Sequence, residues 1–243
     1  MMQPLLEIAA NSVASALAAQ AAGADRIELC AALELGGLTP SPALIALARE
    51  RLRIPVYVLI RPRAGDFVYS GEEHRTMLAD IAHCGAAGCD GVVIGALTAD
   101  GEVDVARCRE LVAAAGAMGA TFHRAIDVSR DPSRALEDIV ALGCGRVLSS
   151  GAAPGALQGA ALLRALVEQA GARIVVMPGA GIDAGNIAEL RRLTGAREFH
   201  ASARRALPSA MRHAPAVALG MEAGEVRSDE HDVRRLAAAL RRA

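Results

Sequence analysis

The stretch "RIELC" places two charges and a thiol at alternate positions. Arg26, Glu28 and Cys30 alternate with Ile27 and Leu29, which is the period of a β-strand with one polar and one apolar face. A buried carboxylate must be paired or change its protonation state, so Glu28 is a candidate for acid–base catalysis. Cys30 is a candidate ligand for a soft metal ion such as Cu(I), which prefers thiolates.

Other polar side chains fall at equivalent positions of neighbouring β-rich runs. The same alternation turns Glu7, His123 and His200 to the side that carries Glu28. Carboxylates and imidazoles gathered in one interior suit general acid and base catalysis, because histidine titrates near neutral pH. The alternative is a structural network, in which Glu28 pairs with an arginine and the histidines are hydrogen-bonded core residues.

Two further motifs predict an anion site. In "RPRAGDFVYS", Arg61 and Arg63 suit a carboxylate or phosphate, with two solvated charges as the alternative. In "MPGAGI", Gly179 and Gly181 follow the seventh β-rich run, where a barrel binds phosphate through backbone N–H groups. With Ala184 this motif imitates a dinucleotide fingerprint, but its place in the chain argues against a nucleotide cofactor. A plain tight turn is the alternative.

Short β-rich runs alternate with helical apolar stripes along the whole chain. Eight such units in about 250 residues predict an α/β fold, a single (β/α)8 barrel over residues 1–243. A doubly wound open sheet is the alternative, although its outer strands need not carry polar residues facing one interior. The predicted strands cover residues 5–10, 26–30, 56–62, 91–97, 120–126, 146–151, 173–179 and 198–203.

The helices between these strands have recognisable ends. Ser41 before Pro42 predicts a helix N-terminus, and Ser70 with Glu73 forms a capping box. An irregular connection over 204–228 follows the last strand, and we expect a lid or an oligomer contact there. Glycines expected to end helices are Gly23, Gly88, Gly116, Gly143, Gly171 and Gly195.

The composition limits the class of protein. Of 243 residues, 53% are hydrophobic and 22% are charged, with a net charge of −1. The absence of a long basic stretch argues against a nucleic acid partner. Without a signal-peptide pattern or a sufficiently long apolar run, we expect a cytoplasmic protein that does not bind membranes. Five scattered cysteines fit reduced thiols better than disulfides.

The order of these motifs resembles the CutC family. The matching blocks are "LLEIAANS", "ADRIELCAALELGGLTPS", "IRPRAGDFVYS", "TFHRAID", "VLSSG", "MPGAGI" and "FHASA". The resemblance implies a cytoplasmic (β/α)8 barrel, often a homo-oligomer, associated by name with copper homeostasis and copper binding. Family members often carry a cysteine in the first strand where this chain has Ala9 and Ala10. The interior set that the resemblance implies is Glu7, Arg26, Glu28, Cys30, Arg61, Arg63, His123, Arg124 and His200.

Three functions are consistent with this sequence. By resemblance, the chain is a copper homeostasis protein that binds Cu(I) through Cys30, alone or with a neighbouring barrel group or another subunit. Alternatively, it is an enzyme acting on a small anionic or phosphorylated substrate, with Glu28 and His123 as the acid/base pair and Glu7 and His200 beside them. Isomerisation, aldol-type cleavage and hydrolysis are the candidate reactions. The third function is a non-enzymatic oligomeric scaffold.

Overall fold

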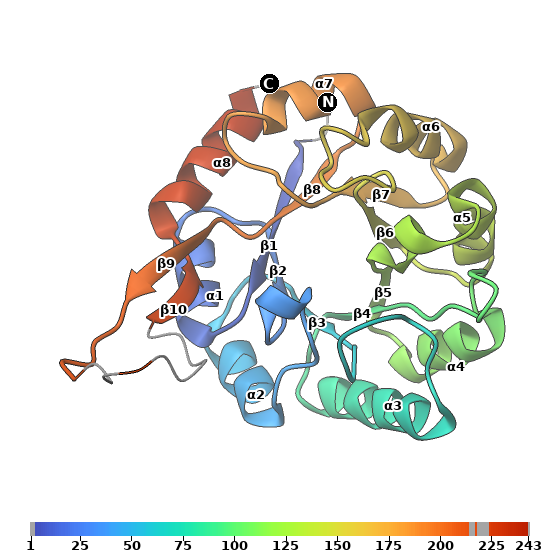
Figure 1. Cartoon of the computed structure of the whole chain (residues 1–243), viewed down its shortest axis with the longest axis horizontal. Coiled ribbons are helices and arrows are strands. Elements are labelled where there is room, and N and C mark those ends of the chain that lie inside the picture. The colour runs from blue at the N-terminus through green and yellow to red at the C-terminus, as the bar shows by residue number, and fades with distance from the viewer. Residues whose placement is uncertain (1–2, 214–216, 218–223, 243) are drawn as a thin grey trace.

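Eight parallel strands form a ring around a polar centre in the computed structural model, which describes residues 3–213, 217 and 224–242 (Figure 1). Neighbouring strands follow chain order, and β1 pairs with β8. A parallel bridge between Gly179 and His200 joins β7 to β8 and closes the ring. The predicted (β/α)8 barrel is confirmed. The strands are β1 Leu5–Ala10, β2 Arg26–Leu29, β3 Val56–Leu59, β4 Gly91–Ile94, β5 Gly119–Phe122, β6 Arg146–Ser149, β7 Val175–Pro178 and β8 Glu198–Ala201.

Helices cover the outside of this ring (Figure 1). Ser41 caps the N-terminus of α2, and the capping box of Ser70 and Glu73 begins α3, as predicted. None of the helices that the structure describes is long and apolar enough to cross a membrane. They are α1 Val13–Ala21, α2 Pro42–Arg51, α3 Gly71–Ala86, α4 Val105–Ala115, α5 Pro132–Ala141, α6 Ala160–Ala170, α7 Ile187–Thr194 and α8 Glu230–Arg242, with short 3-10 helices η1 Leu33–Leu35 and η2 Arg124–Val128.

The strand alternation predicted from the sequence is present. Ile27 and Val58 belong to the large apolar core between the strands and the helices. Cys30, Tyr57 and Leu59 form a separate buried cluster on the inner face of the barrel. Successive residues of β2 and β3 therefore serve two different environments, one apolar and one that lines the centre.

The connection after β8 differs from the irregular segment that was predicted. Its two ends, β9 Arg204–Pro208 and β10 Gly224–Ser228, pair as an antiparallel hairpin that projects from the barrel (Figure 1). Pairing between segments so far apart in the chain leaves no local turn signal. The hairpin is tied to the barrel by Ser228, whose hydroxyl donates to the Ala9 carbonyl at 3.1 Å. Residues 214–216 and 218–223 lie outside the described residues, and a role of this segment in assembly stays a prediction.

Glycines on β4 and β5 make room for the ring of Tyr57 at the base of the barrel. A Cβ atom at Gly91 would lie 2.1 Å from Tyr57 Cε1, and one at Gly119 would lie 2.2 Å from its hydroxyl oxygen. The ring contacts two guanidinium groups, with its centroid 5.3 Å from Arg26 Cζ and 5.0 Å from Arg146 Cζ. Neither glycine can therefore gain a side chain without displacing the ring.

We expect Gly91→Ala to lower the free energy of unfolding by about 1–3 kcal/mol, because the new methyl group overpacks the Tyr57 ring. Urea denaturation measures this loss. Gly71→Ala is the matched control, since nothing lies within 4 Å of its added Cβ atom at the start of α3. It should leave stability unchanged or raise it slightly. Equal losses in both variants would contradict the steric explanation.

Candidate functional site

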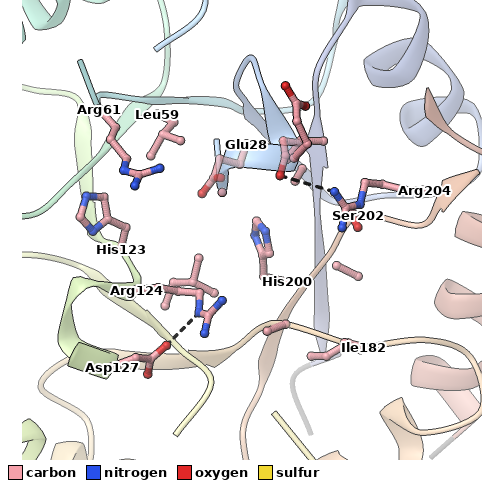
Figure 2. A pocket seen from close by; sticks show the side chains of 18 of the residues that line it. Glu28, Leu59, Arg61, His123, Arg124, Asp127, Ile182, His200, Ser202 and Arg204 are labelled. Carbon is pink, nitrogen blue, oxygen red and sulfur yellow. Dashed lines mark hydrogen bonds and ion pairs between the residues drawn. The ribbon is translucent and has the colours of Figure 1, made fainter. Parts of the chain in front are cut away.

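A cavity of about 660 Å³ opens at the carboxyl ends of the strands (Figure 2). Active sites of (β/α)8 enzymes lie at this end of the barrel, because the loops that follow the strands converge there. The volume is within the range of sites for small molecules. Its charged and titratable lining residues are Glu28, Glu34, Arg61, His123, Arg124, Asp127, His200 and Arg204.

A network of ion pairs lies beneath the cavity. We call it the floor network, and its members are Glu7, Arg26, Arg146 and Glu198. Arg26 pairs with Glu7 and, at 2.6 Å, with Glu198, which also accepts from Arg146 at 2.7 Å. Glu7 is fully buried. Burial alone would raise the pKa of Glu7, but Arg26 and His200 outweigh it and hold the pKa at about 2. Glu7 is therefore a permanent carboxylate.

His200 connects the floor network to the cavity. Its Nδ1 donates to Glu7 Oε1 at 2.7 Å, and the imidazole lines the cavity wall. Burial would lower the pKa of His200, but the charge of Glu28 and the hydrogen bond with Glu7 raise it above the usual value. Because a carboxylate holds its Nδ1 proton, His200 has a fixed ring orientation that leaves Nε2 free of this bond.

Glu28 is a buried carboxyl group in the cavity wall. The residue is 6% exposed, and its Oε2 has no hydrogen-bond partner among the described residues. Nor does it form an ion pair with Arg26 or Arg61, as the structural alternative required; its neighbours are His200 and Glu7, each offering an atom within 4.8 Å. Burial, reinforced by the charge of Glu7, raises the pKa of Glu28 to about 7. A carboxyl group of this kind exchanges protons readily at neutral pH.

His123 lies at the end of β5 on the opposite side of the cavity (Figure 2). Its Nδ1 accepts from the Ala125 N–H at 3.2 Å, and its ring packs against Phe67 at 4.9 Å between centroids. Burial and the nearby Arg61 lower its pKa to about 3. The imidazole is thus neutral at physiological pH, unlike the base titrating near pH 7 that the sequence suggested.

Arg61 carries a positive charge that no carboxylate neutralises within the described part of the chain. It is 6% exposed, and its guanidinium donates to the carbonyl oxygens of Leu35, Gly37 and Gly65, each at 2.9 Å. These carbonyls hold two loops together and fix the guanidinium at the cavity wall. Its charge remains available to an anion that enters the cavity.

Arg63 is placed differently although it is only two residues away. Its guanidinium donates to Glu73 at 2.6 Å and to Asp66 at 2.9 Å. The side chain is 35% exposed and is not part of the cavity lining. The structure therefore brings Arg61 to the site and leaves Arg63 in solvated ion pairs at the surface.

Three residues without a role in the sequence analysis complete the charged lining, namely Glu34, Asp127 and Arg204. Asp127 accepts from Arg124 Nε at 2.8 Å and from Ser149 Oγ at 2.6 Å, so it fixes the guanidinium of Arg124 at the cavity mouth. Arg204, at the start of β9, also lines the cavity. The signals were present: Asp127 closes the motif "TFHRAID", and Arg204 follows β8 by three residues.

The glycine-rich loop after β7 reaches the cavity through its second glycine. Ala180 and Gly181 line the wall, both with positive φ angles of 85° and 65°. Gly179 instead donates its N–H to Ser149 at 2.9 Å, which removes it as an anion ligand. Gly179 also allows close packing against β6, because an added Cβ atom would lie 2.5 Å from Leu148 Cδ1.

Cys30 points inward as predicted but lies behind the cavity wall. It is fully buried, and its thiol donates to the Ala10 carbonyl at 3.7 Å. Burial and the charge of Glu28 raise its pKa well above the usual value, which disfavours the thiolate that Cu(I) requires. Among the residues described, the group suited to a metal ion is Glu7, Glu28 and His200, which offers oxygen and nitrogen atoms and no sulfur. These residues do not fit Cu(I).

Comparisons with known proteins agree on one family. The CutC family model matches residues 4–205. A CutC protein of Xylella fastidiosa is 64% identical over 199 residues, which are 82% of this chain and 74% of that protein. One from Xanthomonas campestris is 60% identical over 210 residues, 86% of this chain and 87% of its own. The solved structure of CutC from Streptococcus agalactiae, named for copper homeostasis, superposes with a TM-score of 0.79 at 34% identity, covering 82% of this chain and 99% of its own.

The raised pKa of Glu28 predicts a dependence of stability on pH. Its folded pKa of about 7 exceeds the ordinary 4.5, so the folded chain binds this proton more tightly than the unfolded chain. The resulting stabilisation is present below pH 4.5 and is lost as the pH rises through 7. Between about pH 5 and pH 8, the free energy of unfolding of the wild type should fall by about 2–3 kcal/mol relative to Glu28→Gln.

Urea denaturation across this pH range measures the difference. Glu34→Gln is the control, since this glutamate lies at the same cavity with an exposed side chain. Its curve should follow the wild type. Parallel curves for the wild type and Glu28→Gln would show that Glu28 ionises normally.

Proposed function

The chain belongs to the CutC family, and from this premise we propose that its barrel is an enzyme that transfers a proton on a small anionic substrate. The observation that carries the proposal is the buried Glu28 carboxyl group in the cavity wall, which has a pKa of about 7 and an oxygen without a hydrogen-bond partner in the described part of the chain. A structural carboxylate in a barrel centre would be fully paired, as Glu7 is. Glu28 instead faces the cavity (Figure 2).

The cavity supplies a partner for each end of such a substrate. The charge of Arg61, which pairs with no carboxylate of the described residues, attracts the anionic group, and Gly181 and Arg204 line the same cavity. Glu28 then accepts a proton from the substrate, and His200, held by Glu7, relays protons next to it. A guanidinium that is already fixed by carbonyls binds an anion with little loss of side-chain entropy.

The substrate proton transfer is tested by solvent exchange. We expect the wild type to incorporate deuterium from heavy water into one member of a panel of phosphorylated sugars and keto acids, detected by mass spectrometry. Glu28→Gln should lose about 10²–10⁴-fold in rate, because an amide cannot accept the proton. Glu34→Gln should retain the rate. Identical labelling by the wild type and Glu28→Gln, or none in either, would refute the proposal.

The name of the Streptococcus agalactiae relative refers to copper homeostasis. In this chain, the surroundings of Cys30 do not match a Cu(I) site. The thiol is buried and protonated, and Ala9 and Ala10 supply no second sulfur from β1. We therefore propose that this chain does not bind Cu(I) through Cys30. A link to copper would then run through the chemistry of the cavity.

A competition titration with a chromogenic Cu(I) chelator checks this proposal. We expect the wild type and Cys30→Ser to bind the same number of Cu(I) ions with the same affinity, because two or three soft ligands are needed for tight binding. Thermal unfolding without metal shows whether the serine variant is folded. Loss of one tightly bound Cu(I) ion in the folded variant would restore Cys30 as a copper ligand.

A further inference from the structure

We infer that His123 is a second catalytic group, a neutral imidazole whose Nε2–H donates to a carbonyl oxygen of the substrate. The substrate class is accordingly a small anionic aldehyde or ketone, and the reaction is an enolisation. This inference rests on the proposed proton transfer by Glu28, and it adds the group that stabilises the negative charge produced by that transfer. It also changes the part that the sequence suggested for His123, from proton acceptor to hydrogen-bond donor.

The hydrogen bonds of the ring decide where its proton lies. Nδ1 accepts from the Ala125 N–H at 3.2 Å, so a neutral imidazole must carry its proton on Nε2. The ring cannot easily turn over, because Phe67 packs against it at 4.9 Å between centroids and the glycine at 95 leaves only the space the ring fills. A Cβ atom at Gly95 would lie 2.5 Å from His123 Cε1. The donor is therefore held in one tautomer and one orientation.

This donor lacks an acceptor. His123 is 5% exposed, and its Nε2 has no hydrogen-bond partner among the residues that the structure describes. A buried N–H group without an acceptor destabilises the folded chain, so its retention points to a ligand that supplies the oxygen. The cavity supplies the place, since His123, Arg61 and Glu28 all line it (Figure 2).

The charges around the ring favour a donor over a base. Arg61 is the charged group that acts on His123, and it disfavours a second positive charge there. The same guanidinium stabilises an oxyanion next to the imidazole. His200 shows the opposite environment, because a carboxylate holds its Nδ1 proton and raises its pKa. One cavity thus contains one histidine suited to carry a proton and one suited to donate a hydrogen bond.

The proposed step balances within the cavity. The Glu28 carboxylate forms an O–H bond with the proton on the carbon next to the carbonyl group, and the C–H bond breaks. The C–H electron pair becomes the C=C bond, while the carbonyl π pair moves to the oxygen that accepts from His123 Nε2–H. Return of the proton from Glu28 to a carbon atom completes an isomerisation or epimerisation. No oxidant, reductant or metal ion is consumed.

Nitrogen-15 NMR of the histidine-labelled full chain tests the donor directly. The probe is phosphoglycolohydroxamate, an anionic analogue of an enediolate. We expect His123 to be neutral with a protonated Nε2 between about pH 5 and 8, and its Nε2–H proton to move downfield by more than about 1 ppm on saturation with the probe. A proton on Nδ1, titration to the cation in this range, or an Nε2–H signal that does not move would overturn the inference.

Variants connect this signal to the reaction. His123→Gln keeps an N–H donor and should retain deuterium exchange within about 10-fold, whereas His123→Leu should lose about 10²–10³-fold. His83→Gln, on the exposed side of α3, is the control for histidine replacement. Equal losses in the glutamine and leucine variants, with urea midpoints unchanged, would also overturn the donor role. If Glu28→Gln exchanges normally while the Nε2–H signal moves, the proposed base fails and the donor stands.

Discussion

The ion pair between Glu7 and Arg26 is the contact on which the centre of this barrel depends. A carboxylate without access to water is stable only if cations and hydrogen-bond donors surround it. Arg26 provides the charge from β2, and His200 provides a hydrogen bond from β8. Because β1 lies between those two strands, one side chain joins three neighbouring strands across the interior.

The consequences of this pair extend upward into the cavity. Glu7 pairs with Arg26 and accepts the hydrogen bond from His200. Glu28 lies beside them, and its Oε2 has no hydrogen-bond partner among the described residues. Its pKa rises to about 7, whereas that of Glu7 falls to about 2. The surroundings of these two glutamates, on adjacent strands, thus shift their pKa values in opposite directions. In enzymes, such a difference is typical of a carboxylate pair with two separate roles. Burial and the charge that Glu7 keeps through its ion pair raise the pKa of Glu28.

The sequence predicted those parts of the site that obey strand periodicity. The alternation in "RIELC" placed Glu28 and Cys30 on the inner face, and they lie there. The distinction between Arg61 and Arg63 could not be predicted, because both follow the end of β3, where the alternation stops and loop carbonyls decide the direction. The depth of Cys30 was also hidden, since Leu59 and the loop at Gly37 cover it from other parts of the chain.

Contacts that form only on folding further limit what the sequence can predict. The tautomer of His123 depends on the Ala125 N–H, two residues away, yet the motif "TFHRAID" alone does not show that the chain turns there. The hairpin of β9 and β10 joins segments whose pairing has no short-range signature. Fold class is thus readable from repeated period and helix caps, whereas protonation states depend on contacts made only after folding.

The closed base of the barrel limits the route by which molecules can enter and leave the cavity. Tyr57, in contact with Arg26 and Arg146, fills the interior beneath the cavity, and none of these three side chains belongs to the cavity wall. A molecule that reaches Glu28 therefore arrives and leaves through the mouth between the loops. A bound molecule and an incoming molecule therefore compete for the same opening, and one must leave before the next can bind.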